Sequence, residues 1–315
     1  MSNRQSLVVW VALGLVALLS GCESSDLERK GPIVGVTLRA DASPINWTLE
    51  PATSGRTEKI LLVSQGSGCA PARSSVNVEM ISALAVDFAT LTIEKYGVKP
   101  SDAPSDPSND CSTAYFENHT VSQRVMDAKM VLADLDRRGQ LPYDLALFGG
   151  SEGGAVVSIL AHEVPEARAV VVLSTGTGLT MSEFFPMVVP PPVAAQMEVV
   201  FEAARANPES TEIAGGNSYK WWADVLDRRL SDDLLKSTVP ILIVHGEKDR
   251  SAPVLSARAA RDAFSEAGES ERLTYWEFEG FDHQMVDGDG VSHMGDVLAD
   301  VVSWLNDGTD ETPAN

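Results

Sequence analysis

The stretch Leu145–Gly154 has the sequence LALFGGSEGG, and residues 155–160 continue it as AVVSIL. A short apolar run thus leads into G-x-S-x-G, and an amphipathic helical pattern follows at once. This order predicts a strand, a sharp turn and a helix, with Ser151 at the point of the turn. Such a turn forces its central residue toward strained, positive-φ geometry. The glycines around it carry no Cβ, so the strand and the helix can approach closely. We therefore expect Ser151 to be presented as a nucleophile.

The first residues predict export. Arg4 is the only charge before an apolar run over residues 7–19, which is shorter than the ~20 residues needed to span a bilayer and has the length of an export signal. The Leu-Ser-Gly-Cys that ends at Cys22 resembles the lipoprotein box of bacterial lipoproteins. That resemblance implies removal of residues 1–21 and acylation of Cys22; an ordinary secretory signal is the alternative. A stable anchor takes two or more acyl chains, so we expect a lipid-anchored protein of the bacterial cell envelope, facing the periplasm or the exterior.

The composition and length argue against one class of binding partner and indicate the number of domains. The net charge of −21 becomes −22 without residues 1–21, whose only charge is Arg4. A chain this acidic repels nucleic acid, so no nucleic-acid partner is expected. About 290 mature residues can bury one large core. We expect a linker over residues 22–31, one α/β domain over 32–306, and a flexible polar tail over 307–315.

Two further cysteines, Cys69 and Cys111, remain after Cys22. Disulfides persist in exported proteins, and an even number of remaining cysteines favours pairing. We therefore expect a structural disulfide between them. Neither cysteine lies in a strand-turn-helix pattern, so neither is expected to be catalytic.

Strands and helices alternate along most of the chain, which predicts a mostly parallel, doubly wound α/β sheet. The alternation breaks down over about 175–236, where Pro190-Pro191-Pro192 and Trp221-Trp222 occur. This segment is predicted to be an insertion of short helices above the sheet. It either packs over the edge of the domain or caps an apolar substrate pocket. The expected strands are 33–39, 45–49, 59–64, 88–96, 144–148, 169–173, 239–245 and 273–278, and the expected helices are 76–86, 121–138, 194–206, 257–267 and 291–305.

A serine nucleophile needs a general base, and the base needs an orienting carboxylate. The buried strand Val239–His245 ends in a turn that places Asp249 just past its carboxyl end, where catalytic groups gather in open α/β sheets. Glu247 competes with Asp249 but is expected on the surface of the turn. The base should follow the last strand, and His283 does so directly, with Gly280 allowing the turn.

Four other histidines are weaker candidates for the base. His293 is the alternative, but it is expected on the last helix and directed away. His162 lies too far along the helix that follows Ser151, and His245 ends a strand and is expected to be structural. His119 is expected only to cap or solvate the helix that it precedes.

The order Ser151, Asp249, His283 resembles that of the α/β-hydrolase superfamily. The resemblance covers nearly the whole mature chain and also includes the His-Gly-x-x-Asp-x-x-x-Pro turn over residues 245–253 and the Gly-x-x-His turn over 280–283. It implies an α/β-hydrolase-type sheet with a small helical cap, and a catalytic triad of these three residues.

Two backbone N–H groups should stabilise the oxyanion. The first is that of Glu152, at the start of a helix whose dipole also favours negative charge. The superfamily resemblance places the second in the loop Ser64–Cys69, where Gln65 occupies a position that is often histidine. Ser67 is the candidate, with Gly66 and Gly68 as alternatives. A Cys69–Cys111 bond would fasten this loop to the Pro/Ser/Asp-rich loop over residues 100–110.

These roles define a reaction. Ser151 would attack a carbonyl carbon while His283 takes its proton, and water would then hydrolyse the acyl-enzyme. The sequence has no HExxH, no paired cysteine clusters and no GxGxxG after a strand, so no metal or cofactor is expected. The chain resembles small carboxylesterases and lipases, which implies a small ester or acyl substrate. It also resembles the catalytic domains of prolyl-oligopeptidase-like peptidases, so a peptidase or amidase is the alternative, as is a catalytically silent, lipid-anchored binding protein.

Overall fold

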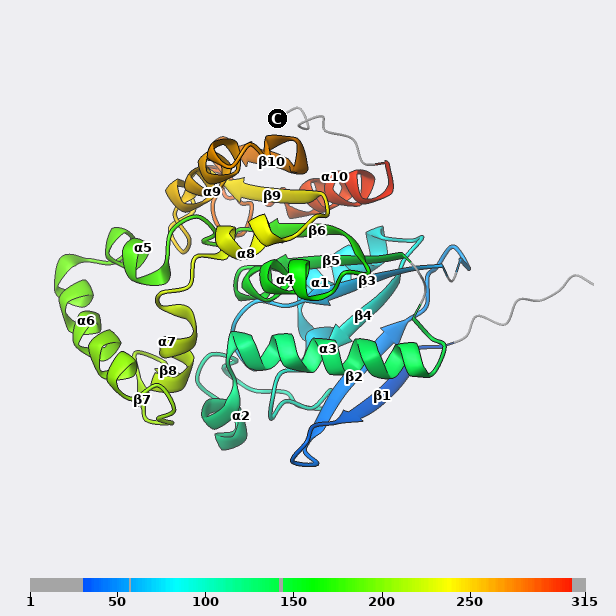
Figure 1. Cartoon of the computed structure of the whole chain (residues 1–315), viewed down its shortest axis with the longest axis horizontal. Coiled ribbons are helices and arrows are strands. Elements are labelled where there is room, and N and C mark those ends of the chain that lie inside the picture. Colours follow the sequence, from blue (N-terminus) through cyan, green and yellow to red (C-terminus); the bar gives the residue numbers. More distant parts are fainter. Residues whose placement is uncertain (1–30, 57, 142–143, 308–315) are drawn as a thin grey trace, which may run out of the picture. The chain divides into compact units, whose positions relative to one another are not determined.

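A computed structural model describes residues 31–56, 58–141 and 144–307. Their strands form a large sheet and a small hairpin (Figure 1). The strands of the large sheet are β1 (Ile33–Leu38), β2 (Pro44–Glu50), β3 (Lys59–Ser64), β4 (Ala89–Ile93), β5 (Asp144–Gly150), β6 (Ala167–Leu173), β9 (Ile241–Gly246) and β10 (Leu273–Phe278). The hairpin consists of β7 (Ile213–Ala214) and β8 (Asn217–Ser218).

The helices connect these strands. They are α1 (Val76–Leu84), α2 (Thr113–Asn118), α3 (Val121–Arg137), α4 (Glu152–Glu163), α5 (Met181–Val188), α6 (Pro191–Ala206), α7 (Tyr219–Val225), α8 (Leu230–Lys236), α9 (Val254–Glu266) and α10 (Met294–Asp307). Two short 3₁₀ turns cover Ala72–Ser74 and Ser270–Arg272.

The large sheet has the order β1-β2-β4-β3-β5-β6-β9-β10. The pairs β1/β2 and β2/β4 are antiparallel, and the other neighbouring pairs are parallel. The predicted mostly parallel, doubly wound sheet is confirmed. Because β3, β4, β5, β6, β9 and β10 run parallel, the loops at their carboxyl ends lie along one edge, which is where such sheets place their ligands.

Helices cover both faces of the sheet (Figure 1). On one face, α3, α4, α8 and α9 pack over the strands, and on the other α1 and α10 do so. The central strands are buried on both sides, which explains their nearly continuous apolar sequences. Four predicted boundaries were wrong by three residues. The strand β4 ends at Ile93 rather than at residue 96, and the side chains of Glu94 and Lys95 just beyond it bind loop backbone. The helices α6, α9 and α10 begin at Pro191, Val254 and Met294 rather than at residues 194, 257 and 291.

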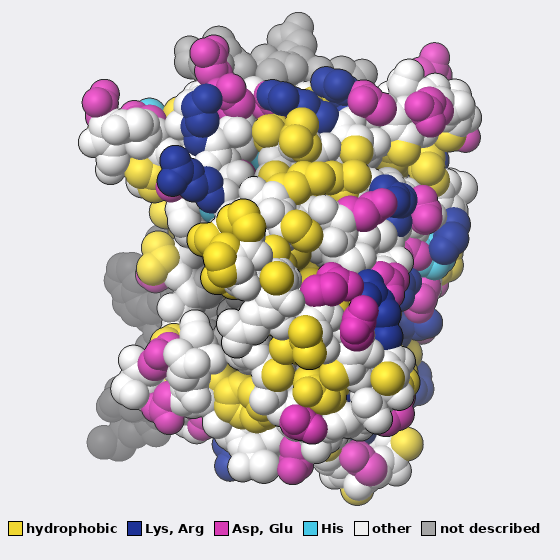
Figure 2. Space-filling view, turned by 90° about the vertical axis from the view of Figure 1, so that its left-hand side faces the viewer, with side chains coloured by type: hydrophobic (Ala, Val, Ile, Leu, Met, Phe, Trp, Pro, Cys, Tyr) yellow, Lys and Arg dark blue, Asp and Glu magenta, His cyan; other side chains and the backbone are white. Residues whose placement is uncertain are grey.

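The segment after β6 contains the elements α5, α6, β7, β8 and α7, which pack around a separate apolar cluster. This cluster includes Phe201, Trp221 and Trp222. The helix α8, by contrast, packs in the main core beside α4. On the side of the molecule that carries α5 and α6, apolar side chains also gather at the surface (Figure 2); the exposed ones on these helices are Met187, Val193 and Val199.

The predicted signal, Cys22 and the linker up to residue 30 lie outside the described residues, as do positions 308–315 of the tail. Among the helices that are described, none combines the length and the apolar character needed to cross a bilayer.

Candidate active site

Ser151 lies between β5 and α4 with φ 53° and ψ −123°, so the predicted positive-φ turn is present. The glycines of the motif are sterically required. A Cβ on Gly149 would lie 2.2 Å from the Gly153 carbonyl oxygen, and one on Gly153 would lie 1.9 Å from the Ser64 carbonyl oxygen. Any larger residue at either position would push α4 away from the sheet. The turn therefore exposes Ser151 at the carboxyl edge of the sheet.

Asp249 and His283 meet at the same edge. The His283 Nδ1 lies 2.8 Å from the Asp249 Oδ2. The other oxygen, Oδ1, accepts hydrogen bonds from the backbone N–H groups of Ser251 (2.8 Å) and Ala252 (2.9 Å). Burial raises the pKa of the Asp249 carboxyl, but the hydrogen bonds from His245, His283 and the backbone outweigh it and hold the pKa well below its usual range. An ionised Asp249 accepts a hydrogen bond from the His283 Nδ1 and so orients the imidazole.

Backbone contacts hold the two loops together. The Lys248 N–H donates to the Phe281 carbonyl at 2.8 Å, and the Gly280 N–H donates to the Glu247 side chain at 3.1 Å. A Cβ on Gly246 would lie 2.5 Å from the Phe281 and Asp282 carbonyl oxygens. The glycine in His-Gly-x-x-Asp thus lets the histidine loop approach the end of β9.

The remaining histidines differ partly from expectation. His245 is buried, as a structural histidine should be, and its Nε2 lies 2.8 Å from the Ala252 carbonyl oxygen and 3.3 Å from the Asp249 Oδ2. His293 precedes α10 instead of lying on it, and its Nε2 lies 2.8 Å from the Asp287 Oδ2. His119 is not a solvated cap: it is 3% exposed and contacts Glu152. His162 lies near the end of α4.

Two cavities meet at Ser151. One has a volume of about 500 Å³ and a lining of both apolar and polar side chains, the polar ones including Gln65, Asn77 and Lys95. The other has a volume of about 280 Å³ and is mainly apolar. Five residues line both cavities and so mark their junction: Ser67, Ser151, Ser174, Ser251 and His283. Apolar residues of the smaller cavity come from α4, α5 and α7, including Ala155, Met181, Phe184, Trp221 and Trp222.

The two predicted oxyanion donors flank this junction. Glu152 is the first residue of α4, where a backbone N–H has no partner within the helix. Ser67 belongs to the loop that follows β3, and a Cβ on the preceding Gly66 would lie only 3.5 Å from the Ser151 Cβ. Within the described part of the chain, neither the Glu152 nor the Ser67 N–H donates to a backbone or side-chain acceptor. Both remain candidates for binding a substrate oxygen.

The sequence did not predict the role of the Glu152 side chain, which is the centre of a buried polar network. Its carboxylate accepts from Arg124 (2.7 Å) and from the Trp221 indole (3.1 Å), and it lies 3.0 Å from the His119 Nε2. Burial raises the pKa of Glu152, but the contacts with His119 and Arg124 outweigh burial and lower the pKa. Burial also lowers the pKa of His119. The network therefore contains an ionised Glu152–Arg124 pair, with His119 bound to the same carboxylate. Glu152 is far in sequence from His119, Arg124 and Trp221, so no local motif marked the network.

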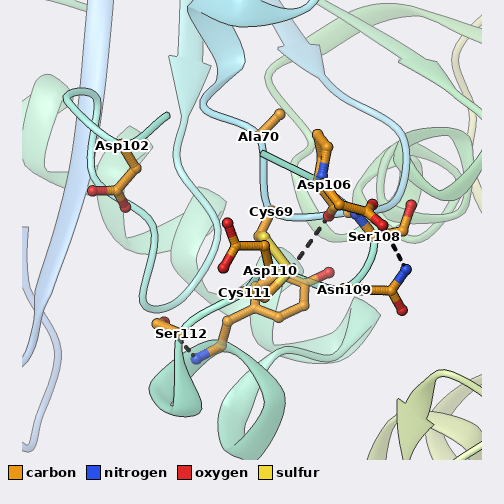
Figure 3. Close-up of a disulfide and its surroundings, with 12 residues drawn as sticks. Cys69, Ala70, Asp102, Asp106, Ser108, Asn109, Asp110, Cys111 and Ser112 are labelled. Atoms are coloured by element: carbon orange, nitrogen blue, oxygen red, sulfur yellow. Dashed lines mark hydrogen bonds between the residues drawn. A yellow bond between two sulfur atoms is a disulfide. The ribbon is translucent and has the colours of Figure 1, made fainter. Parts of the chain in front are cut away.

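The predicted disulfide between Cys69 and Cys111 is present (Figure 3). It fastens the loop Ser64–Cys69, which carries the candidate oxyanion donor Ser67 and is called the donor loop below, to the loop that precedes α2, as expected. The Cys69 N–H reinforces the connection by donating to the Pro107 carbonyl at 2.8 Å. One end of the donor loop is therefore fixed both covalently and by hydrogen bonding.

The sheet, its flanking helices and the turn at Ser151 define the α/β-hydrolase class. The model of a hydrolase family described as serine aminopeptidase, S33, matches residues 114–289, which is more than half of the chain. The chain therefore belongs to this family of hydrolases. The match includes Ser151, Asp249 and His283 but not the donor loop around Ser67.

Solved structures with the same fold belong to several kinds of hydrolase. Est1E from Butyrivibrio proteoclasticus is 17% identical (TM-score 0.57), with 88% of this chain and 98% of that chain covered. A monoacylglycerol lipase of Paleococcus ferrophilus is 15% identical (TM-score 0.55), with 81% and 96% covered. A puromycin-hydrolyzing peptidase of Mycobacterium tuberculosis is 13% identical (TM-score 0.57), with 86% and 38% covered. At these identities the similarity shows the fold alone. No curated protein matches the chain significantly.

Proposed function

We propose that the protein is a serine esterase that cleaves small carboxylic esters through an acyl-enzyme on Ser151. One observation carries the proposal: a serine in a strained turn and a histidine paired with a buried aspartate line the same two cavities. In this mechanism the Ser151 hydroxyl attacks the ester carbonyl while His283 accepts its proton. The protonated His283 then donates a proton to the departing alcohol. Water, activated by the same imidazole, releases the acid.

The two cavities suit the two parts of an ester. The smaller, apolar cavity beneath α5 and α7 fits the acyl chain, because burying apolar surface there is favourable. The larger cavity has a mixed lining, and its polar side chains, among them Gln65, Asn77 and Lys95, fit the alcohol part and incoming water. The oxyanion would form at their junction, between the N–H groups of Glu152 and Ser67. Each such donor accounts for about 10²–10³-fold in rate in serine hydrolases.

The experiment that tests the substrate class compares nitrophenyl esters with nitroanilides of the same acids. We expect turnover of the esters and no detectable cleavage of the anilides, and we expect Ser151→Ala to abolish ester turnover. Cleavage of the anilides that is lost in Ser151→Ala would instead identify a peptidase or amidase. Absence of turnover with every substrate would favour a binding protein that has kept the fold.

Filling the apolar cavity should change acyl specificity. Ala155 on α4 lines only that cavity, and Ala155→Leu would occupy space that an acyl chain needs. We expect kcat/KM for octanoate esters to fall at least tenfold relative to acetate esters, since each lost methylene contact is worth about 0.8 kcal/mol. The matched control is Asn77→Leu in the larger cavity, which should leave the acyl-chain preference unchanged. A chain-length profile measured with nitrophenyl esters decides between these outcomes, and an unaltered profile in Ala155→Leu would refute the assignment.

A second candidate function is an aminopeptidase, and Asp224 favours it. Its carboxylate lines the apolar cavity and accepts from the Ser122 N–H and hydroxyl, whereas Arg228, which lines the same cavity, pairs with Asp233 instead. Such a carboxylate could bind the ammonium group of a peptide N-terminus. If it does, Asp224→Asn should weaken binding of aminoacyl anilides and leave uncharged esters unaffected.

We also propose that the protein is anchored in the bacterial cell envelope through acyl chains on Cys22. The lipoprotein box supports this, and the Cys69–Cys111 bond fits an oxidising compartment. Cells fed an alkynyl palmitate should incorporate the label into the wild-type protein but not into Cys22→Ser. Equal labelling of both proteins would contradict the assignment.

A further inference from the structure

Two buried cations bind the backbone of the donor loop. The Lys95 Nζ donates to the Gly66 carbonyl at 2.5 Å and also to the Gly68 carbonyl. Arg124 donates to the Gln65 carbonyl at 2.6 Å. Lys95 is 3% exposed and Arg124 is 7% exposed. Three carbonyl groups of this short loop are thus turned toward charged groups beneath the active site.

The direction of a carbonyl determines the direction of the N–H that follows it. A trans peptide is planar, so its C=O and N–H point opposite ways. The Gly68 carbonyl binds Lys95, and the Cys69 N–H of the same peptide indeed faces away, toward the Pro107 carbonyl. By the same rule, the Gly66 carbonyl on Lys95 turns the Ser67 N–H away from this lysine.

We propose that Lys95 is a positioning residue, which holds the Ser67 N–H toward the oxygen that becomes negative when Ser151 attacks. The inference rests on the proposed function, because it presumes an acyl-transfer reaction at Ser151. Ser67 lines both cavities together with Ser151, and Gly66 packs directly against the Ser151 side chain. Without the ammonium, two buried carbonyls would lose their donor, and the peptide between Gly66 and Ser67 could rotate.

The positive charge of Lys95 should stabilise the oxyanion, in addition to the effect of the hydrogen bonds that Lys95 donates to the loop. Arg124 from α3, Glu152 from α4, His119 after α2 and the adjacent Glu94 surround it. Burial and the nearby Arg124 lower the pKa of Lys95 to about 7, although Glu152 and Glu94 oppose the shift. The ammonium is therefore present below pH 7 and is lost above it. Electrostatic support of the oxyanion should decline in the same direction, since charge acts strongly where water is excluded.

The decisive variant is Lys95→Met, which keeps the length of the side chain and removes its donors. We expect kcat for a nitrophenyl ester to fall about 100-fold, the lower end of the effect of losing one oxyanion donor, while KM changes less than threefold. Affinity for a trifluoromethyl ketone, which forms a tetrahedral adduct with an active-site serine, should fall by the same factor as kcat/KM. The control is Lys129→Met, which removes a half-exposed lysine on α3 that pairs with Glu163 and should leave all three quantities unchanged.

The outcomes separate the two proposals. A folded Lys95→Met with wild-type kcat and wild-type ketone affinity overturns the positioning role alone. A wild-type protein that hydrolyses no ester, or whose activity survives Ser151→Ala, overturns the proposed function and the positioning role together. If Lys95→Met does not fold, Lys95→Gln is measured in its place. Glutamine removes the charge and leaves one amide donor group for the two carbonyls that Lys95 binds, so kcat should fall at least tenfold, and a wild-type kcat would overturn the role of Lys95.

Discussion

Replacing His283 with alanine should lower kcat for ester hydrolysis by about 10⁴-fold or more, with little change in KM. His283 is the imidazole that the buried Asp249 orients, with 2.8 Å between Nδ1 and Oδ2, and it lines both cavities at Ser151. Loss of a triad member removes proton transfer in both half-reactions, which accounts for an effect of this size. Steady-state kinetics with nitrophenyl acetate measure it.

The chain contains a matched control for this variant. His293 also pairs with an aspartate, with 2.8 Å between its Nε2 and the Asp287 Oδ2, and it is part-buried like His283, with 31% of its side chain exposed against 17%. His293→Ala should keep kcat within about threefold of wild type, because His293 lines neither cavity at Ser151. If His293→Ala were as inactive as His283→Ala, the assignment of the base would be wrong.

Replacing Glu152 with glutamine should lower the free energy of unfolding by about 3–5 kcal/mol. The substitution leaves the Arg124 guanidinium buried without its counter-ion, and removing one partner of a buried ion pair has an effect of this size. Equilibrium urea unfolding at pH 7 with the disulfide intact measures the change. The control is Glu163→Gln, whose partner Lys129 lies at the surface; it should change the free energy by about 1 kcal/mol at most.

The stability difference between wild type and Glu152→Gln should also depend on pH. The contacts with His119 and Arg124 hold the pKa of Glu152 below its unfolded value of about 4.3. Its ionised form therefore stabilises the fold fully above that pH, and the stabilisation is lost as the pH falls toward the folded pKa. Each pH unit below about 4.3 should reduce the difference by about 1.4 kcal/mol. A difference that is the same at pH 7 and pH 3.3 would contradict an ionised Glu152.

Local sequence patterns predicted the parts of the site whose geometry is local. The turn at Ser151 follows from five consecutive residues, and Asp249 and His283 each lie just past a strand with a recognisable apolar pattern. The parallel sheet then brings the three ends together, since it aligns the carboxyl ends of its strands. The disulfide was predictable because the chain has few cysteines.

The polar network beneath the site was not predictable in this way. Arg124 and Glu152 contact each other only because α3 and α4 pack side by side on the sheet, and His119 reaches the same carboxylate from the end of α2. Lys95 lies inside the strand predicted over residues 88–96 but beyond the observed end of β4. Its neighbours in sequence do not indicate that its ammonium binds loop carbonyls. Such contacts depend on tertiary packing, and the spacing of the residues along the chain does not predict them.

A fluorophosphonate probe, with the labelled residue located by peptide mass spectrometry, tests the central claim most directly. The probe phosphonylates serines that an adjacent base activates. We expect one labelled peptide, modified at Ser151, and no labelling of Ser151→Ala or of protein denatured beforehand. Labelling at another serine, or failure of the folded wild-type protein to react, would contradict the claim that Ser151 is an activated nucleophile.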